Sequence, residues 1–183
     1  VREAPGLYDG ATVITDFDRD GDLDAIVTSM IFNAYNGARI YIWDLQTNTQ
    51  IGNTYSPPNV ASERIGVPTI ADVDGDDWPE IVVTTSFNFN ILEDYQNGGG
   101  PAWGSTPATL RANISTTDQS GATGATVFDL NGDGSAEILY RDMTTLRVFD
   151  ANLNVISSIN CTSGTATEYL SLIHISEPTR RAI

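Results

Sequence analysis

Short apolar stretches recur along the whole chain, and each is bounded by Gly, Asp, Asn or Pro. Their enrichment in Val, Ile and Thr predicts buried β-strands, and no stretch of useful length has the apolar spacing of a helix. The segment 96–107, which is rich in Gly, Asn, Ser and Pro, is expected to be a surface loop. Predicted strands cover 12–15, 25–28, 39–43 and 50–55, then 69–71, 81–85, 90–93 and 109–114, and finally 126–128, 138–140, 146–149 and 155–160.

The pattern repeats three times, with an acid-rich loop between the first two strands of each repeat. The leading residues of these loops are Asp16, Asp72 and Asp129, so the period is about 57 residues. Four strands in such a period are typical of a propeller blade. We therefore predict an all-β fold, an incomplete β-propeller of three four-stranded blades within residues 1–169. The expected blades are 8–60, 61–118 and 119–163, and 164–169 would begin a fourth.

Charge is distributed unevenly along the 183 residues. The formal net charge is −15, and the nine basic residues, all arginine, do not cluster, which excludes the basic surface that nucleic acid needs. Thirteen of the 24 acidic residues lie in the three loops, where neighbouring carboxylates repel one another unless a cation neutralises them. Three divalent ions would bring the net charge of −15 to about −9. No apolar run is long enough for a membrane-spanning helix.

The spacing of oxygen-bearing side chains within each loop suits calcium. This hard cation takes about six to eight oxygen ligands, and acids at loop positions 1, 3, 5 and 9 can surround it together with the backbone carbonyl of position 7. Glycine at position 6 allows the required turn, and the second loop has Asp77 there instead. The candidate ligands are Asp16, Asp18, Asp20, Asp22 (carbonyl) and Asp24 in loop one, Asp72, Asp74, Asp76, Trp78 (carbonyl) and Glu80 in loop two, and Asp129, Asn131, Asp133, Ser135 (carbonyl) and Glu137 in loop three.

The EF-hand shares the first half of this loop pattern. It requires a bidentate glutamate at position 12 and flanking helices. Position 12 is occupied here by Val27, Val83 and Tyr140, and each loop leads into a predicted strand. The loops therefore do not fit an EF-hand, and their wide separation also excludes dockerin modules.

The loops and the short motifs before them, Gly10-Ala11, Gly66-Val67-Pro68 and Gly124-Ala125, resemble the FG-GAP (VCBS-type) repeat family. The resemblance covers roughly residues 8–163. It implies a closed propeller like those of integrin α-subunits and many bacterial surface proteins. It also implies that the side chains at positions 1, 3, 5 and 9 bind up to three structural Ca²⁺ ions.

The last residues do not continue the repeat. The segment 170–180 resembles the in-frame translation of an adapter used to prepare DNA sequencing libraries, so we expect 170–183 to be a non-native tail. It contains His174, the single histidine of the chain, and two of the arginines. A histidine ligand or histidine-based catalysis is therefore not expected.

Fold alone leaves several functions open. The resemblance implies a module of a secreted or cell-surface protein that serves adhesion, ligand binding or scaffolding, with a protein or carbohydrate partner. One alternative is part of an extracellular polysaccharide-degrading enzyme, a propeller like that of rhamnogalacturonan lyases, and another is a purely structural stalk. An enzyme is less favoured because no clustered Lys, Arg, His or Tyr marks a groove. Four aromatic residues, Trp43, Trp78, Tyr95 and Trp103, either stack on a ligand or, as we favour, pack within and between blades.

Overall fold

The computed structural model describes residues 10–29, 39–52, 65–93 and 110–162, and within these ranges every regular element is a strand. None of the described residues forms a helix that could cross a membrane. The strands are β1 (Thr12–Thr15), β2 (Asp24–Ser29), β3 (Arg39–Asp44), β4 (Thr49–Gln50), β5 (Thr69–Ala71), β6 (Glu80–Thr85), β7 (Asn88–Leu92), β8 (Leu110–Ser115), β9 (Thr126–Phe128), β10 (Glu137–Arg141), β11 (Thr145–Phe149) and β12 (Val155–Asn160).

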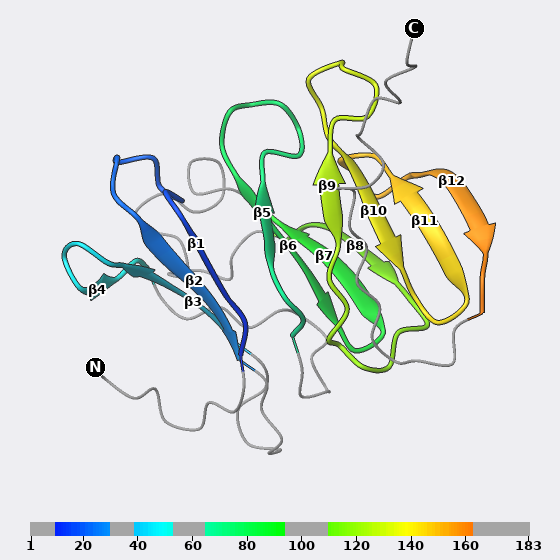
Figure 1. Cartoon of the computed structure of the whole chain (residues 1–183), viewed down its shortest axis with the longest axis horizontal. Coiled ribbons are helices and arrows are strands. Elements are labelled where there is room, and N and C mark those ends of the chain that lie inside the picture. The colour runs from blue at the N-terminus through cyan, green and yellow to red at the C-terminus, as the bar shows by residue number, and fades with distance from the viewer. Residues whose placement is uncertain (1–9, 30–38, 53–64, 94–109, 163–183) are drawn as a thin grey trace, which may run out of the picture.

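The strands form three antiparallel four-stranded sheets that follow the order of the chain, β1 to β4, β5 to β8 and β9 to β12. Figure 1 shows the sheets side by side, with β1, β5 and β9 as neighbours and the later strands of each sheet farther out. The sheets do not close into a ring within the described residues. This arrangement confirms the predicted all-β fold of consecutive propeller-type blades.

Every predicted strand overlaps an observed one, and four have the predicted bounds (12–15, 69–71, 126–128 and 155–160). The second strand of each sheet starts one residue earlier than predicted, because the acid at loop position 9 already pairs in the ladder. Strand β4 is shorter than predicted, and residues 53–55 lie outside the described residues. The predicted loop 96–107, the expected fourth blade at 164–169 and the tail 170–183 also lie outside them.

The core consists of two apolar clusters, one between each pair of neighbouring sheets. Strand β6 supplies both, since Ile81 and Val83 join the cluster toward the first sheet and Val82 joins the cluster toward the third. A strand covered on both faces needs a continuous apolar run rather than alternation, which explains its sequence. In the second cluster, the ring of Phe89 lies 4.6 Å from that of Tyr140, between centroids.

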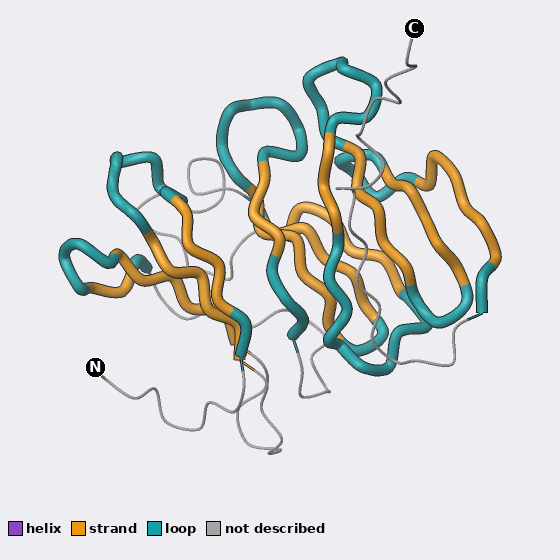
Figure 2. The backbone as a smooth tube through the Cα atoms, viewed as in Figure 1, coloured by secondary structure: helices purple, strands orange, loops and turns teal. Residues whose placement is uncertain are grey.

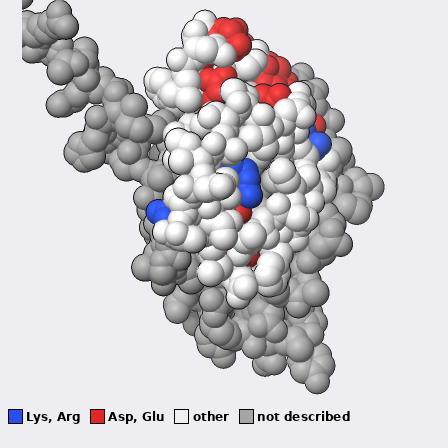
Figure 3. Space-filling view, turned by 90° about the vertical axis from the view of Figure 1, so that its right-hand side faces the viewer, with Lys and Arg blue, Asp and Glu red and all other residues white. Residues whose placement is uncertain are grey.

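The face of the third sheet that points away from the second cluster also carries apolar side chains. No sheet covers this face among the described residues. Phe128, Leu130 and Ile159 are 53%, 49% and 63% exposed there. Val73, the counterpart of Leu130 in the second sheet, is fully buried. Figure 3 views the molecule from this side and shows the acidic side chains gathered at the end that carries the loops.

Candidate metal centres

The three acid-rich loops, 16–24, 72–80 and 129–137, join the first two strands of each sheet and lie at the same end of the molecule (Figure 2). They share one hydrogen-bond scheme. The carboxylate at position 1 accepts from the N–H of position 6 at 3.2, 2.9 and 3.0 Å, and the one at position 5 accepts from position 7 at 2.9, 2.8 and 2.9 Å. The acid at position 9 accepts from the N–H of position 2 at 2.8, 2.7 and 2.7 Å. These bonds hold the side chains in place without an ion.

Two positions in every loop have left-handed backbone. Position 6 has φ values of 98° at Gly21, 74° at Asp77 and 93° at Gly134, so the aspartate adopts the conformation that glycine takes in the other loops. Position 4 adopts the same left-handed region, which was not predicted from the sequence. It has φ values of 57° at Arg19, 82° at Gly75 and 78° at Gly132.

In loop one, the carboxylates of Asp16, Asp18 and Asp24 converge, with one oxygen of each within 4.8 Å of the others. Asp24 is 1% exposed, and Oδ1 of Asp16 is buried without a hydrogen-bond partner among the described residues. Burial, followed by the charges of Asp24 and Asp20, raises the pKa of Asp18 to about 6. The loop therefore concentrates negative charge that its own hydrogen bonds do not offset.

Loop two repeats this convergence with Asp72, Asp74 and Glu80, whose oxygens also lie within 4.8 Å of one another. Glu80 is fully buried. A difference from loop one is a cation at the site, because Nη1 of Arg111 lies 2.6 Å from Oδ2 of Asp74.

In loop three, an amide replaces the carboxylate at position 3. The Nδ2 group of Asn131 donates to Oδ2 of Asp133 and to Oε1 of Glu137, both at 3.0 Å. The N–H of Gly134 is the main cause that lowers the pKa of Asp129, helped by the other backbone N–H groups of the loop. Hydrogen bonds therefore offset the negative charge of loop three more fully than that of loop one.

The structure does not bring all the predicted ligands together. The convergent groups of loops one and two are the acids at positions 1, 3 and 9. The carboxylates at position 5, from Asp20, Asp76 and Asp133, are exposed and hold the N–H of position 7. The residues at position 7, whose backbone carbonyls are predicted ligands, are half-buried. They are Asp22, Trp78 and Ser135.

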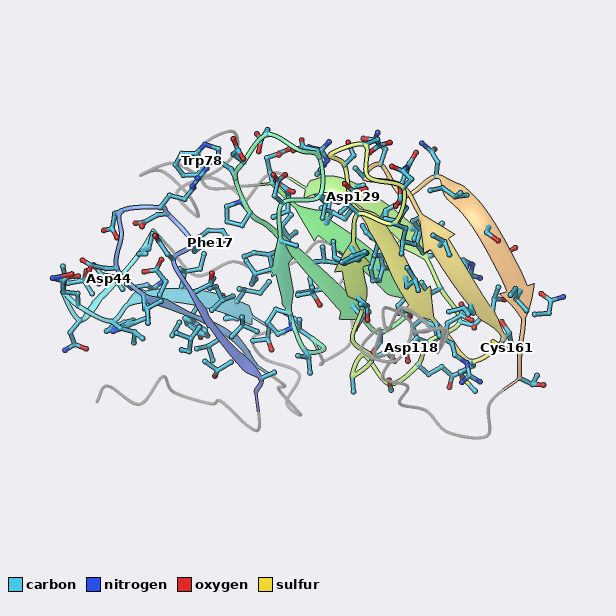
Figure 4. The ribbon with its side chains drawn as sticks, turned by 45° about the horizontal axis from the view of Figure 1, so that its top comes forward. Phe17, Asp44, Trp78, Asp118, Asp129 and Cys161 are labelled. Atoms are coloured by element: carbon cyan, nitrogen blue, oxygen red, sulfur yellow. The ribbon has the colours of Figure 1, made fainter. Side chains whose placement is uncertain are left out.

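Neighbouring loops contact one another across the blades. The guanidinium of Arg19 in loop one donates to the carbonyl of Asp77 and lies over the ring of Trp78, 5.6 Å from its centroid. Between loops two and three, the N–H of Ala136 donates to the carbonyl of Val73 at 3.1 Å. Trp78 therefore lies between two blades at the loop end of the molecule, as Figure 4 shows.

Of the other predicted aromatic residues, the structure describes only Trp43. Trp43 is half-buried, and its Nε1 donates to Oδ1 of Asn48 at 3.2 Å within the first sheet. Tyr95 and Trp103 lie outside the described residues.

Position 2 of loops one and two connects the site to the core. Phe17 and Val73 are fully buried in the clusters between sheets, and their N–H groups hold the acids at position 9. An ordered loop and a packed blade interface therefore stabilise each other.

A second set of polar groups lies at the opposite end of the sheets, where Figure 4 labels Asp118. Asp142 is 1% exposed, and Nη1 of Arg147 lies 2.6 Å from its Oδ2. Burial works against its charged form, but the hydrogen bonds from Arg147 and from the N–H groups of Thr144, Thr117 and Thr145 outweigh burial and hold the pKa of Asp142 well below its usual range. Asp142 thus stabilises the fold and was not identified from the sequence.

Comparison with known protein families gives one match. Residues 16–83 match the FG-GAP-like repeat. The matched segment begins at the first residue of loop one, contains loop two and ends within β6, so it spans a little more than one period of the repeat. No curated protein matches the chain. Residues 16–83 are thus similar to the FG-GAP-like repeat, in agreement with the three consecutive four-stranded sheets of propeller-type blades.

Proposed function

We propose that the chain is a calcium-binding β-propeller module of a secreted or cell-surface protein, in which Ca²⁺ ions at the acid-rich loops have a structural role. The observation that carries the proposal is the convergence of three carboxylate oxygens within 4.8 Å in loops one and two. Carboxylate oxygens are the ligands that calcium prefers, and the hydrogen-bond scheme holds them in place without an ion.

The residues of loop one fit an oxygen-binding divalent cation best. Oδ1 of Asp16 is buried without a hydrogen-bond partner among the described residues, and a cation would satisfy it. In loop three the fit is poorer, because Asn131 turns N–H groups toward Asp133 and Glu137. Coordination there would require its amide to reverse.

A structural role follows from where the loops lie. Each sheet buries its faces only against neighbours, and the loop residues Phe17 and Val73 belong to those interfaces. An ion that binds the folded loop and not the unfolded chain stabilises the blades through mass action, by about 2.7 kcal/mol at a hundredfold excess over Kd.

Calcium-dependent melting tests the proposal. We expect the melting temperature to be higher in calcium at a hundredfold excess over Kd than in EDTA, by roughly 5–10 °C for a gain of about 2.7 kcal/mol. The variant D16N should lose part of this increase. D150N is the matched control, since Asp150 also accepts N–H bonds in a tight turn but lies outside the loops. Equal melting temperatures with and without calcium would refute the proposal.

The location and the partner follow from the same proposal. Calcium modules that work outside the cell typically have Kd values on the order of 0.1–1 mM, which match extracellular calcium. We propose adhesion, ligand binding or scaffolding as the role of the propeller surface, with a protein or carbohydrate as partner. A Kd below about 1 µM would instead indicate a site that fills at cytosolic calcium levels.

A further inference from the structure

An irregularity in the second sheet brings an arginine to loop two. The pairing of β7 with β8 shifts register between Ile91 and Leu92, which leaves Arg111 as the extra residue of a bulge. Bulges redirect side chains, and this one aims the guanidinium at the loop. The third sheet has the same shift between β11 and β12, but Ile156 occupies the extra position there and is 56% exposed.

Three groups from different parts of the chain hold the guanidinium. Nη1 of Arg111 lies 2.6 Å from Oδ2 of Asp74 and 3.4 Å from Oε1 of Glu93, and Nε donates to the carbonyl of Ala151 at 3.3 Å. The side chains of Arg111 and Asp74 are 19% and 20% exposed. Such a half-buried, charge-assisted contact is stronger than an ordinary surface ion pair.

The three loops therefore differ at position 3. Asp74 has a guanidinium on Oδ2, while its Oδ1 accepts from the N–H of Asp76 at 3.3 Å. In loop one no salt bridge to Asp18 is formed within the described residues, and the neighbouring Arg19 points to the next loop instead. In loop three the residue is the neutral Asn131.

We propose that Arg111 is the resident counter-cation of loop two, which holds Asp74 in the calcium-free chain and opposes the binding of calcium there. The inference rests on the proposed calcium function and adds an order among the loops. Loop one depends on a metal ion for positive charge, whereas loop two has a built-in cation that repels an incoming Ca²⁺ and occupies one of its ligands. Loop two is therefore a weaker site than loop one.

Isothermal titration with calcium tests this order on the wild-type chain and on R111M, which keeps much of the apolar stem and removes the charge. We expect R111M to tighten one class of sites by about tenfold, because a neighbouring positive charge is lost. R147M is the matched control. Arg147 also forms a 2.6 Å bridge to an aspartate with its side chain 19% exposed, but it lies at the end away from the loops.

Each outcome of the titration decides the inference. Tightening in R111M, unchanged binding in R147M and loss of the tightened site in the double variant R111M/D72A would support it. Binding of R111M within twofold of wild type would overturn it and leave calcium binding intact. Absence of binding in the wild type would refute the proposed function itself, and this inference with it. If R111M does not fold, R111Q replaces it, since it also removes the charge and keeps a polar side chain. R111Q should show the same tightening, and binding within twofold of wild type would overturn the inference.

Discussion

The residue at position 2 of each loop offers a direct measure of how much the loops contribute to blade packing. The same position is fully buried at Phe17 and Val73 but 49% exposed at Leu130. Truncation of a buried phenylalanine to alanine costs about 3–5 kcal/mol, since it removes apolar contacts and leaves a cavity. Two buried carbon atoms are removed by V73A, which should cost about 2 kcal/mol. Truncation of the half-exposed Leu130 to alanine should lower the free energy of unfolding by about 1 kcal/mol or less.

Thermal unfolding of the F17A, V73A and L130A variants in saturating calcium measures these differences. One kcal/mol shifts the melting temperature of a chain of this size by about 2–4 °C, so F17A should melt roughly 6–20 °C below wild type. L130A is the internal control, because it changes the same loop position without a covering sheet among the described residues. Equal losses in F17A and L130A would refute the assignment of Phe17 to the interface between the first two sheets.

Two further predictions concern charge and backbone conformation. Because the pKa of Asp142 is lower in the folded chain than its ordinary value, its contribution to stability is present above about pH 5 and is lost as the pH falls toward the lowered value, so D142N should show a shallower loss in urea unfolding between about pH 5 and 3. An equal loss of unfolding free energy in D142N and wild type over this pH range would contradict this. G75A and G132A both place alanine at a left-handed φ, of 82° and 78°, but a Cβ at Gly75 would lie 2.5 Å from the carbonyl oxygen of Gly134, whereas one at Gly132 meets nothing within 4 Å. G132A should therefore cost about 1 kcal/mol and G75A roughly 2–4 kcal/mol in thermal unfolding, and equal costs would argue against contact between loops two and three.

The repeat made most of the fold predictable. Three acid-rich loops at one spacing, each between apolar stretches, predicted the strands and their grouping into sheets, because a strand covered on both faces needs a continuous apolar run such as that of β6. The start of the second strands was missed by one residue. An acid such as Glu80 does not look like a strand residue, yet it is fully buried and pairs in the ladder.

The site was predictable at the positions that spacing defines and not at those that tertiary contacts define. The acids at positions 1, 3 and 9 converge in loops one and two, as the spacing indicated. Arg111 lies 37 residues from Asp74, and a bulge aims it at the loop, so no local pattern signals their contact. Arg19 and Asp77 are 58 residues apart and meet because neighbouring blades place their loops side by side.

Equilibrium dialysis of the purified chain against radioactive calcium, at neutral pH and physiological salt, tests calcium binding by the loops most directly. We expect saturable binding of up to three ions per chain. The variant D16N should lose one ion, while D150N should bind as wild type does. Less than one ion per chain at 10 mM calcium, about ten times the weakest Kd of extracellular modules, would contradict the claim that these loops are calcium sites.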